Sequence, residues 1–218
     1  VCDVVGETGL QFYGKMCASM SHEIKNSLAI IQEHAGLLDD FAAMAGQGMP
    51  INPERVKSLA EKIQGQVNRA NGIVKGLNRL AHSADDPVKS VDLGEELTNL
   101  ISLSYRLAAR RGVIVKATSP EKAVTINASP FFLQNLLWLC LDFAMDAAGD
   151  EKKVEIHVQS SPAGANVIFS QLKGVDQTTL PAFPGEGTMA LLDALGAQVE
   201  IKVETKELVL AMPGDIKP

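Results

Sequence analysis

Two long stripes of apolar residues set the strongest limit on how this chain can fold. In the first stripe, apolar side chains recur every three or four positions from Phe12 to Phe41, which predicts one continuous helix of about ten turns. In the second stripe, from Val56 to Leu80, the spacing alternates between three and four residues, which is typical of the seam of a helical bundle or coiled coil. The first half of the chain is therefore expected to form two long helices.

The segment between the two stripes predicts a turn. Residues 46–50, Gly-Gln-Gly-Met-Pro, break the first helix, and Asn52 followed by Pro53 is a favourable N-cap and first-turn proline for the second. The resulting hairpin cannot bury both stripes alone, so we expect a homodimer in which two hairpins form a four-helix bundle. The alternative is that both helices pack on the second half of the chain.

After an Ala-Asp-Asp-Pro linker at residues 84–87, the pattern of the chain changes. Helices are predicted over residues 91–111, 130–148 and 189–195, and strands over residues 113–117, 124–127, 154–158, 167–169, 199–203 and 208–211. Helices on one side of a mixed or antiparallel sheet make an α+β sandwich. We therefore predict a helical hairpin over residues 1–86 and an α/β sandwich over residues 87–218.

Composition and charge narrow the classes of partner. The chain has 20 Lys and Arg against 26 Asp and Glu, a net charge of −6, and no basic cluster, so we expect no nucleic-acid partner. Its least polar stretch, residues 128–141, falls short of the roughly 20 apolar residues that a bilayer span needs, so we expect no direct membrane contact. Three cysteines without CxxC spacing argue against a zinc site or a disulfide framework and favour a cytoplasmic location.

The motif that can carry chemistry lies in the first stripe, where residues 21–28 read Ser-His-Glu-Ile-Lys-Asn-Ser-Leu. At 100° per residue, His22 and Asn26 share one face of the helix, away from the apolar stripe, to which Ile24 and Leu28 belong. An exposed, neutral imidazole has a ring nitrogen that can attack phosphorus. Glu23 can accept its proton, and Asn26 can orient a water molecule or a phosphoryl oxygen.

The string around His22 closely resembles the H-box of bacterial sensor histidine kinases, especially the nitrogen-regulation type with His-Glu-Ile-Lys-Asn. The resemblance implies that His22 is the phosphoacceptor, that Glu23 assists proton transfer and that Asn26 supports the dephosphorylating reaction. That family commonly has proline after the asparagine, whereas this chain has Ser27. The helix should consequently keep its backbone hydrogen bond there and bend less.

The second half resembles the ATP-binding domain of the same family, but its first nucleotide-binding box is degenerate. Where the family writes Asn-Ala-x-x-Ala, the asparagine that would hold magnesium is Phe143 and the other asparagine of the box is Leu139. A register shifted by one residue places Trp138 and Asp142 there instead. Of these, only Asp142 can ligate a hard cation.

The other two boxes are damaged as well. The adenine-binding box, normally Asp-x-Gly-x-Gly, has Ser170 in place of the aspartate and Leu172 in place of the first glycine, and retains Gly174. The phosphate-loop glycines survive as Gly185 and Gly187, a pattern equally typical of a loop before a helix. We therefore expect the sandwich to be kept as a fold and lost as an ATP-binding site, with no cofactor and no metal held by this chain.

These observations favour a histidine phosphotransferase that resembles a kinase with an intact phosphoacceptor hairpin. It would exchange a phosphoryl group between His22 and the receiver-domain aspartate of a response regulator, and magnesium would come with the receiver. Met16, Met20 and Leu77 are expected to flank the docking surface. Two alternatives stay open: an active sensor histidine kinase that autophosphorylates His22 from ATP, and a non-catalytic dimeric scaffold or pseudokinase.

Overall fold

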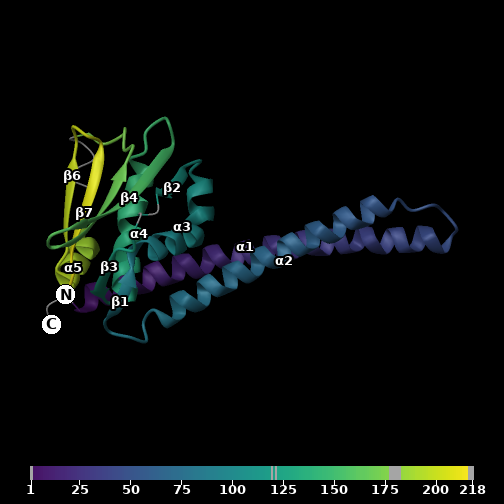
Figure 1. The fold of residues 1–218 in the computed structure, drawn as a ribbon, viewed down its shortest axis with the longest axis horizontal. Coiled ribbons are helices and arrows are strands. Elements are labelled where there is room, and N and C mark those ends of the chain that lie inside the picture. The colour runs from purple at the N-terminus through teal and green to yellow at the C-terminus, as the bar shows by residue number, and fades with distance from the viewer. Residues whose placement is uncertain (1, 119, 121, 177–182, 216–218) are drawn as a thin grey trace.

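The computed structural model describes residues 2–118, 120, 122–176 and 183–215, and Figure 1 shows a long helical hairpin that projects from an α/β sandwich. Helix α1 (Cys2–Gly46) and helix α2 (Pro53–His82) form the hairpin. The predicted start of α2 is confirmed, because the Asn52 side chain accepts a hydrogen bond from the backbone N–H of Glu54 at 2.9 Å. None of the described helices is long and apolar enough to cross a membrane.

The second half folds as the predicted α+β sandwich. Its helices are α3 (Leu93–Arg110), α4 (Pro130–Asp146) and α5 (Glu186–Leu195), and its strands are β1 (Lys89–Asp92), β2 (Ile114–Thr118), β3 (Thr125–Ala128), β4 (Lys153–Ser161), β5 (Gly164–Ser170), β6 (Gln198–Lys202) and β7 (Glu207–Pro213). The large sheet has the order β2-β4-β5-β7-β6, in which β2 and β4 are parallel and the other neighbours antiparallel. β1 and β3 form a separate antiparallel pair, and the helices lie between the large sheet and α1 (Figure 1).

Two predicted helix starts are wrong. The helix expected from residue 189 begins at Glu186. The helix expected from residue 91 begins at Leu93, because Val91 belongs to β1, where it pairs with Ile126. Asp92 ends this strand and caps α3, since its side chain accepts a hydrogen bond from the backbone N–H of Glu95 at 2.9 Å. The sequence of β1 has Val91 as its one apolar residue and therefore shows no alternation that would predict a strand.

The first half of α1 packs on the sandwich rather than standing free of it. Phe12, Met16 and Met20 are at most 2% exposed and lie in the same hydrophobic core as the helices of the second half. The Phe12 ring meets Phe131 of α4 edge-on, with 5.9 Å between ring centroids. The structure therefore shows the alternative arrangement for this part of α1, which packs on the second half of the chain and not in a bundle.

Candidate functional site

The predicted phosphoacceptor lies on α1 just beyond the point where this helix leaves the sandwich. His22 and Asn26 are both exposed, one helical turn apart, as the spacing predicts. Met20, two residues before His22, is buried, whereas Leu28 is 55% exposed. His22 therefore stands at a junction between a helix segment covered by the second half of the chain and a segment that projects from it.

The buried side of α1 at this junction is not the one the apolar stripe predicts. Ser27 is 1% exposed, while Ile24 is half-buried and Leu28 is largely exposed. Met16 and Met20 were expected to flank a docking surface, and this prediction is wrong, because the sandwich covers both side chains. The apolar residues beyond the junction keep an uncovered face in the single chain.

Glu23 is held by two arginines from different elements. Nη2 of Arg69, on α2, lies 2.5 Å from Oε2 of Glu23, and Nη1 of Arg106, on α3, lies 3.8 Å from Oε1. The Glu23 side chain is only 16% exposed. Its carboxylate is therefore turned toward α2 and α3, and its role as proton acceptor for His22 stays a prediction.

Sequence reasoning missed Arg69 and Arg106. They lie 46 and 83 residues after Glu23, so no local spacing connects either of them to the motif. The ion pairs arise because α2 folds back along α1 and α3 packs against both. A cavity of about 380 Å³ beside them is lined by Glu23, Arg69 and Tyr105, among others.

An aromatic pair lies where the resemblance would place a magnesium ligand. Phe143, near the end of α4, is half-buried and stacks on Phe183 with 4.6 Å between centroids and 23° between ring planes. Leu172 and Val175, in the segment that follows β5, are fully buried. Apolar side chains carry neither the lone pairs nor the charge that binds a hard cation.

In the register shifted by one residue, the candidate cation ligand is Asp142, and its carboxylate is already paired with two basic side chains. Its Oδ1 lies 2.8 Å from Nη2 of Arg111, and its Oδ2 lies 3.3 Å from Nζ of Lys15, which comes from α1. Lys15 also lies over the ring of Trp138, 4.8 Å from its centroid. Within the described residues, no group of three or more His, Cys, Asp or Glu side chains could hold a metal ion.

The remnants of the adenine-binding box serve local structure. The hydroxyl of Ser170 donates a hydrogen bond to the backbone carbonyl of Glu155 on the neighbouring strand at 3.3 Å. The backbone N–H of Gly174 donates to the carbonyl of Ala147 at 2.8 Å, and a side chain at Gly174 would approach that carbonyl to 3.1 Å. The first contact joins β5 to β4, and the second fastens the loop after β5 to the end of α4.

Of the two glycines at the start of α5, Gly187 lies against the hairpin. Gly185 is the N-cap of α5, and Gly187 lies in its first turn. A Cβ atom at Gly187 would lie 2.5 Å from the hydroxyl oxygen of Thr8, so only glycine lets α5 approach α1 this closely. Among the residues that the structure describes, those at the three boxes therefore do not fit a magnesium–nucleotide complex.

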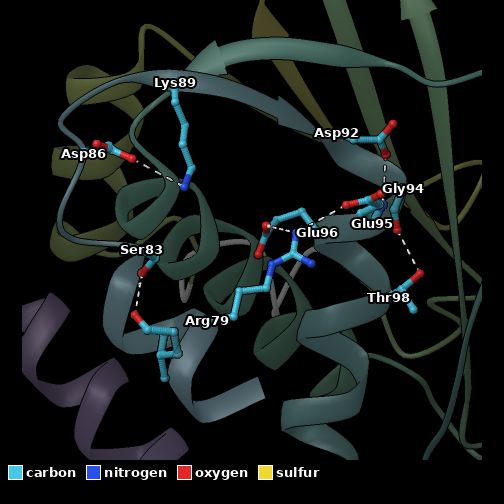
Figure 2. Close-up of polar contacts among 10 residues, drawn as sticks. Arg79, Ser83, Asp86, Lys89, Asp92, Gly94, Glu95, Glu96 and Thr98 are labelled. Atoms are coloured by element: carbon cyan, nitrogen blue, oxygen red, sulfur yellow. Dashed lines mark hydrogen bonds and ion pairs between the residues drawn. The ribbon is translucent and has the colours of Figure 1, made fainter. Parts of the chain in front are cut away.

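A second polar cluster ties the end of α2 to the start of α3. Figure 2 shows Arg79 reaching from α2 toward Glu96, whose Oε2 accepts a hydrogen bond from Nη2 of Arg79 at 3.3 Å. Glu95 lies 3.7 Å from the same nitrogen. The Glu96 side chain is 2% exposed, and burial raises the pKa of its carboxyl, while the neighbouring Arg79 opposes that shift.

Buried Glu96 is expected to make the protein less stable as the pH rises. Because its pKa is higher in the folded chain than its ordinary value of 4.5, the folded state binds more protons between the two values, and stability falls as pH increases through that window. Replacement of Glu96 by Gln should make the free energy of unfolding depend less on pH in this window. Urea unfolding from pH 7 down to pH 4.5 measures the slope, and exposed Glu95→Gln is the matched control. An unchanged slope in Glu96→Gln would contradict the prediction.

Comparison with known proteins agrees with the motif around His22. The His Kinase A (phospho-acceptor) domain matches residues 13–85. Sensor histidine kinase ZraS of Klebsiella oxytoca is 29% identical over 151 residues, which are 69% of this chain and 31% of that protein. ZraS of Escherichia coli strain K12 is 25% identical over 170 residues, which are 78% of this chain and 35% of that protein. The chain thus spans about a third of the length of these curated relatives.

Among solved structures, a bacterial phosphotransferase is 12% identical, with a TM-score of 0.46 over 92% of this chain and 95% of that one. The chain thus contains a His Kinase A phospho-acceptor domain and is sensor histidine kinase-like in sequence. His22 lies within the part that matches the phospho-acceptor domain.

Proposed function

We propose that this chain is a histidine phosphotransferase, which exchanges a phosphoryl group with the receiver domain of a response regulator and does not use ATP. The observation that carries the proposal is the stack of Phe143 on Phe183, which fills the place of a metal ligand while His22 stays exposed. A kinase needs a magnesium ion to neutralise the phosphates of ATP, and neither Phe143 nor Phe183 offers an oxygen ligand to hold one. An exposed imidazole, in contrast, supplies the nucleophile for phosphotransfer without any nucleotide.

The transfer step follows from the chemistry of the two groups. A ring nitrogen of His22 attacks the phosphorus of an aspartyl phosphate on the receiver. The N–P bond forms as the bond between phosphorus and the aspartate oxygen breaks, and the aspartate leaves as a carboxylate. The proton on the other ring nitrogen passes to solvent, and the reverse step returns the phosphoryl group. Asn26, one turn away on the same face, is placed to contact a phosphoryl oxygen or a water molecule.

A homodimer is part of the proposal. Apolar side chains lack cover on both helices of the hairpin: Leu28 of α1, beyond the junction at His22, is 55% exposed, and Val74 of α2, on the sandwich side of the junction, is 42% exposed. Burying such residues against a second hairpin releases water from apolar surface and completes a four-helix bundle. Two copies of His22 would then stand on the outside of the bundle, where receivers can reach them.

The test uses receiver domains that have been phosphorylated with labelled acetyl phosphate and freed of excess donor. We expect label to move to this chain as acid-labile, alkali-stable phosphate, and to return to a second, unlabelled receiver. In parallel, the chain is incubated with labelled Mg-ATP, which should leave it unlabelled.

The other outcomes distinguish the alternatives. Acid-labile label from Mg-ATP would identify a working histidine kinase and contradict the proposal. Receiver binding without any phosphoryl transfer in either direction would identify a non-catalytic scaffold or pseudokinase.

A further inference from the structure

The two arginines around Glu23 come from both halves of the chain. Arg69 belongs to the hairpin, whereas Arg106 belongs to the first helix of the sandwich. The guanidinium of Arg69 is also placed over the ring of Tyr105, 5.8 Å from its centroid, so α3 fixes its position as well. We call Glu23, Arg69 and Arg106 the arginine bracket.

The bracket changes the sign of the charge beside the phosphoacceptor. Glu23 directly follows His22, and alone it would place one negative charge next to a phosphoryl group that carries about two. Two arginines and one glutamate sum to 2 − 1 = +1. Opposite charges attract even through a partly solvated medium. A bracket with a net positive charge, next to His22 in the chain, therefore favours a phosphoryl group on His22.

We propose that Arg69 and Arg106 are positioning residues for phosphotransfer. By pairing with Glu23 they hold its carboxylate away from the phosphoryl group and make the neighbourhood of His22 attractive to that group. Through Arg106, the sandwich contributes to the phosphoacceptor site even though it does not use ATP. The inference rests on the proposed function, and it gives a reason for retaining a domain whose nucleotide boxes are degenerate.

The cavity beside the bracket makes this charge accessible to dissolved ions. It measures about 380 Å³, and both Glu23 and Arg69 line it. Arg69 is 48% exposed and Arg106 is 26% exposed. Salt should therefore screen the effect of the bracket, whereas a purely structural role would not depend on ionic strength in this way.

The experiment is a series of charge variants loaded chemically, so that it needs no cognate regulator. Wild-type protein and variants are treated with potassium phosphoramidate, and the initial rate of acid-labile phosphate formation on His22 is measured, with His22→Ala subtracted as background. We expect Arg106→Gln to slow loading roughly threefold to tenfold, and Glu23→Gln to speed it by a similar factor. The double variant restores the charge to +1 and should return to the wild-type rate, and added salt should narrow all of these differences.

Two controls guard against trivial causes. Lys57→Gln removes a charge from an exposed site on α2, about three turns before Arg69, and should change little. Arg106→Lys keeps the charge and should retain most of the rate, which excludes a loss of folding as the cause.

The outcomes separate this inference from the proposed function. Equal rates across the series, or slower loading in Glu23→Gln, would overturn the role of the bracket; the second result would make Glu23 a proton acceptor. Receivers that exchange no phosphate with the wild-type chain would overturn the proposed function even if the charge series behaved as expected.

Discussion

Replacement of His22 by Ala is expected to remove all acid-labile phosphate that receivers can transfer to this chain. The N–P bond can form only at an accessible ring nitrogen, and alanine offers no nucleophile. The loss should be complete within the sensitivity of a phosphate-transfer gel, while circular dichroism and the unfolding midpoint should stay close to wild type, because the His22 side chain is exposed.

The remaining histidines provide the matched controls for this prediction. His34 lies on the same helix, 12 residues after His22, and it is half-buried. His82 lies 2.7 Å from the carboxylate of Asp85 at the end of α2. Variants His34→Ala and His82→Ala should transfer phosphate normally. Label that persists in His22→Ala and disappears in one of these would move the phosphoacceptor to a different histidine.

Replacement of Phe12 by Ala is expected to lower the free energy of unfolding by about 3–5 kcal/mol. Phe12 is 2% exposed and belongs to the core that α1 shares with the sandwich, where its ring contacts Phe131. Truncation leaves a cavity at the contact between the two halves and removes the edge-on ring pair. Urea unfolding followed by circular dichroism and by the fluorescence of Trp138, the single tryptophan, measures the change.

The comparison variant is Leu10→Ala on the same helix. Leu10 is 72% exposed, so its truncation should change the free energy of unfolding by no more than about 0.5 kcal/mol. Circular dichroism reports mainly the hairpin helices, whereas Trp138 reports α4. If Phe12→Ala leaves the Trp138 transition unchanged, the hairpin and the sandwich unfold independently and the shared core does not couple them.

The helical hairpin and its turn could be predicted from the sequence, because local interactions determine them. The three-and-four spacing, the Asn52 cap and the Pro53 first turn all act within a few residues, and the structure has each of them. The exposure of His22 also follows from helical periodicity. The strands of the large sheet alternate clearly enough to be found, whereas the short β1 does not.

Only the tertiary structure decided what covers each part of the first stripe and what surrounds the phosphoacceptor. Phe12, Met16 and Leu28 belong to one stripe, yet the sandwich buries the first two and leaves Leu28 exposed, because periodicity shows which face is apolar and not which surface covers it. Arg69 and Arg106 reach Glu23 from distant segments, since the partner of a charged side chain depends on how helices pack. The sequence alone thus predicts His22 as the nucleophile, and the packing of α2 and α3 determines the charges around the neighbouring Glu23.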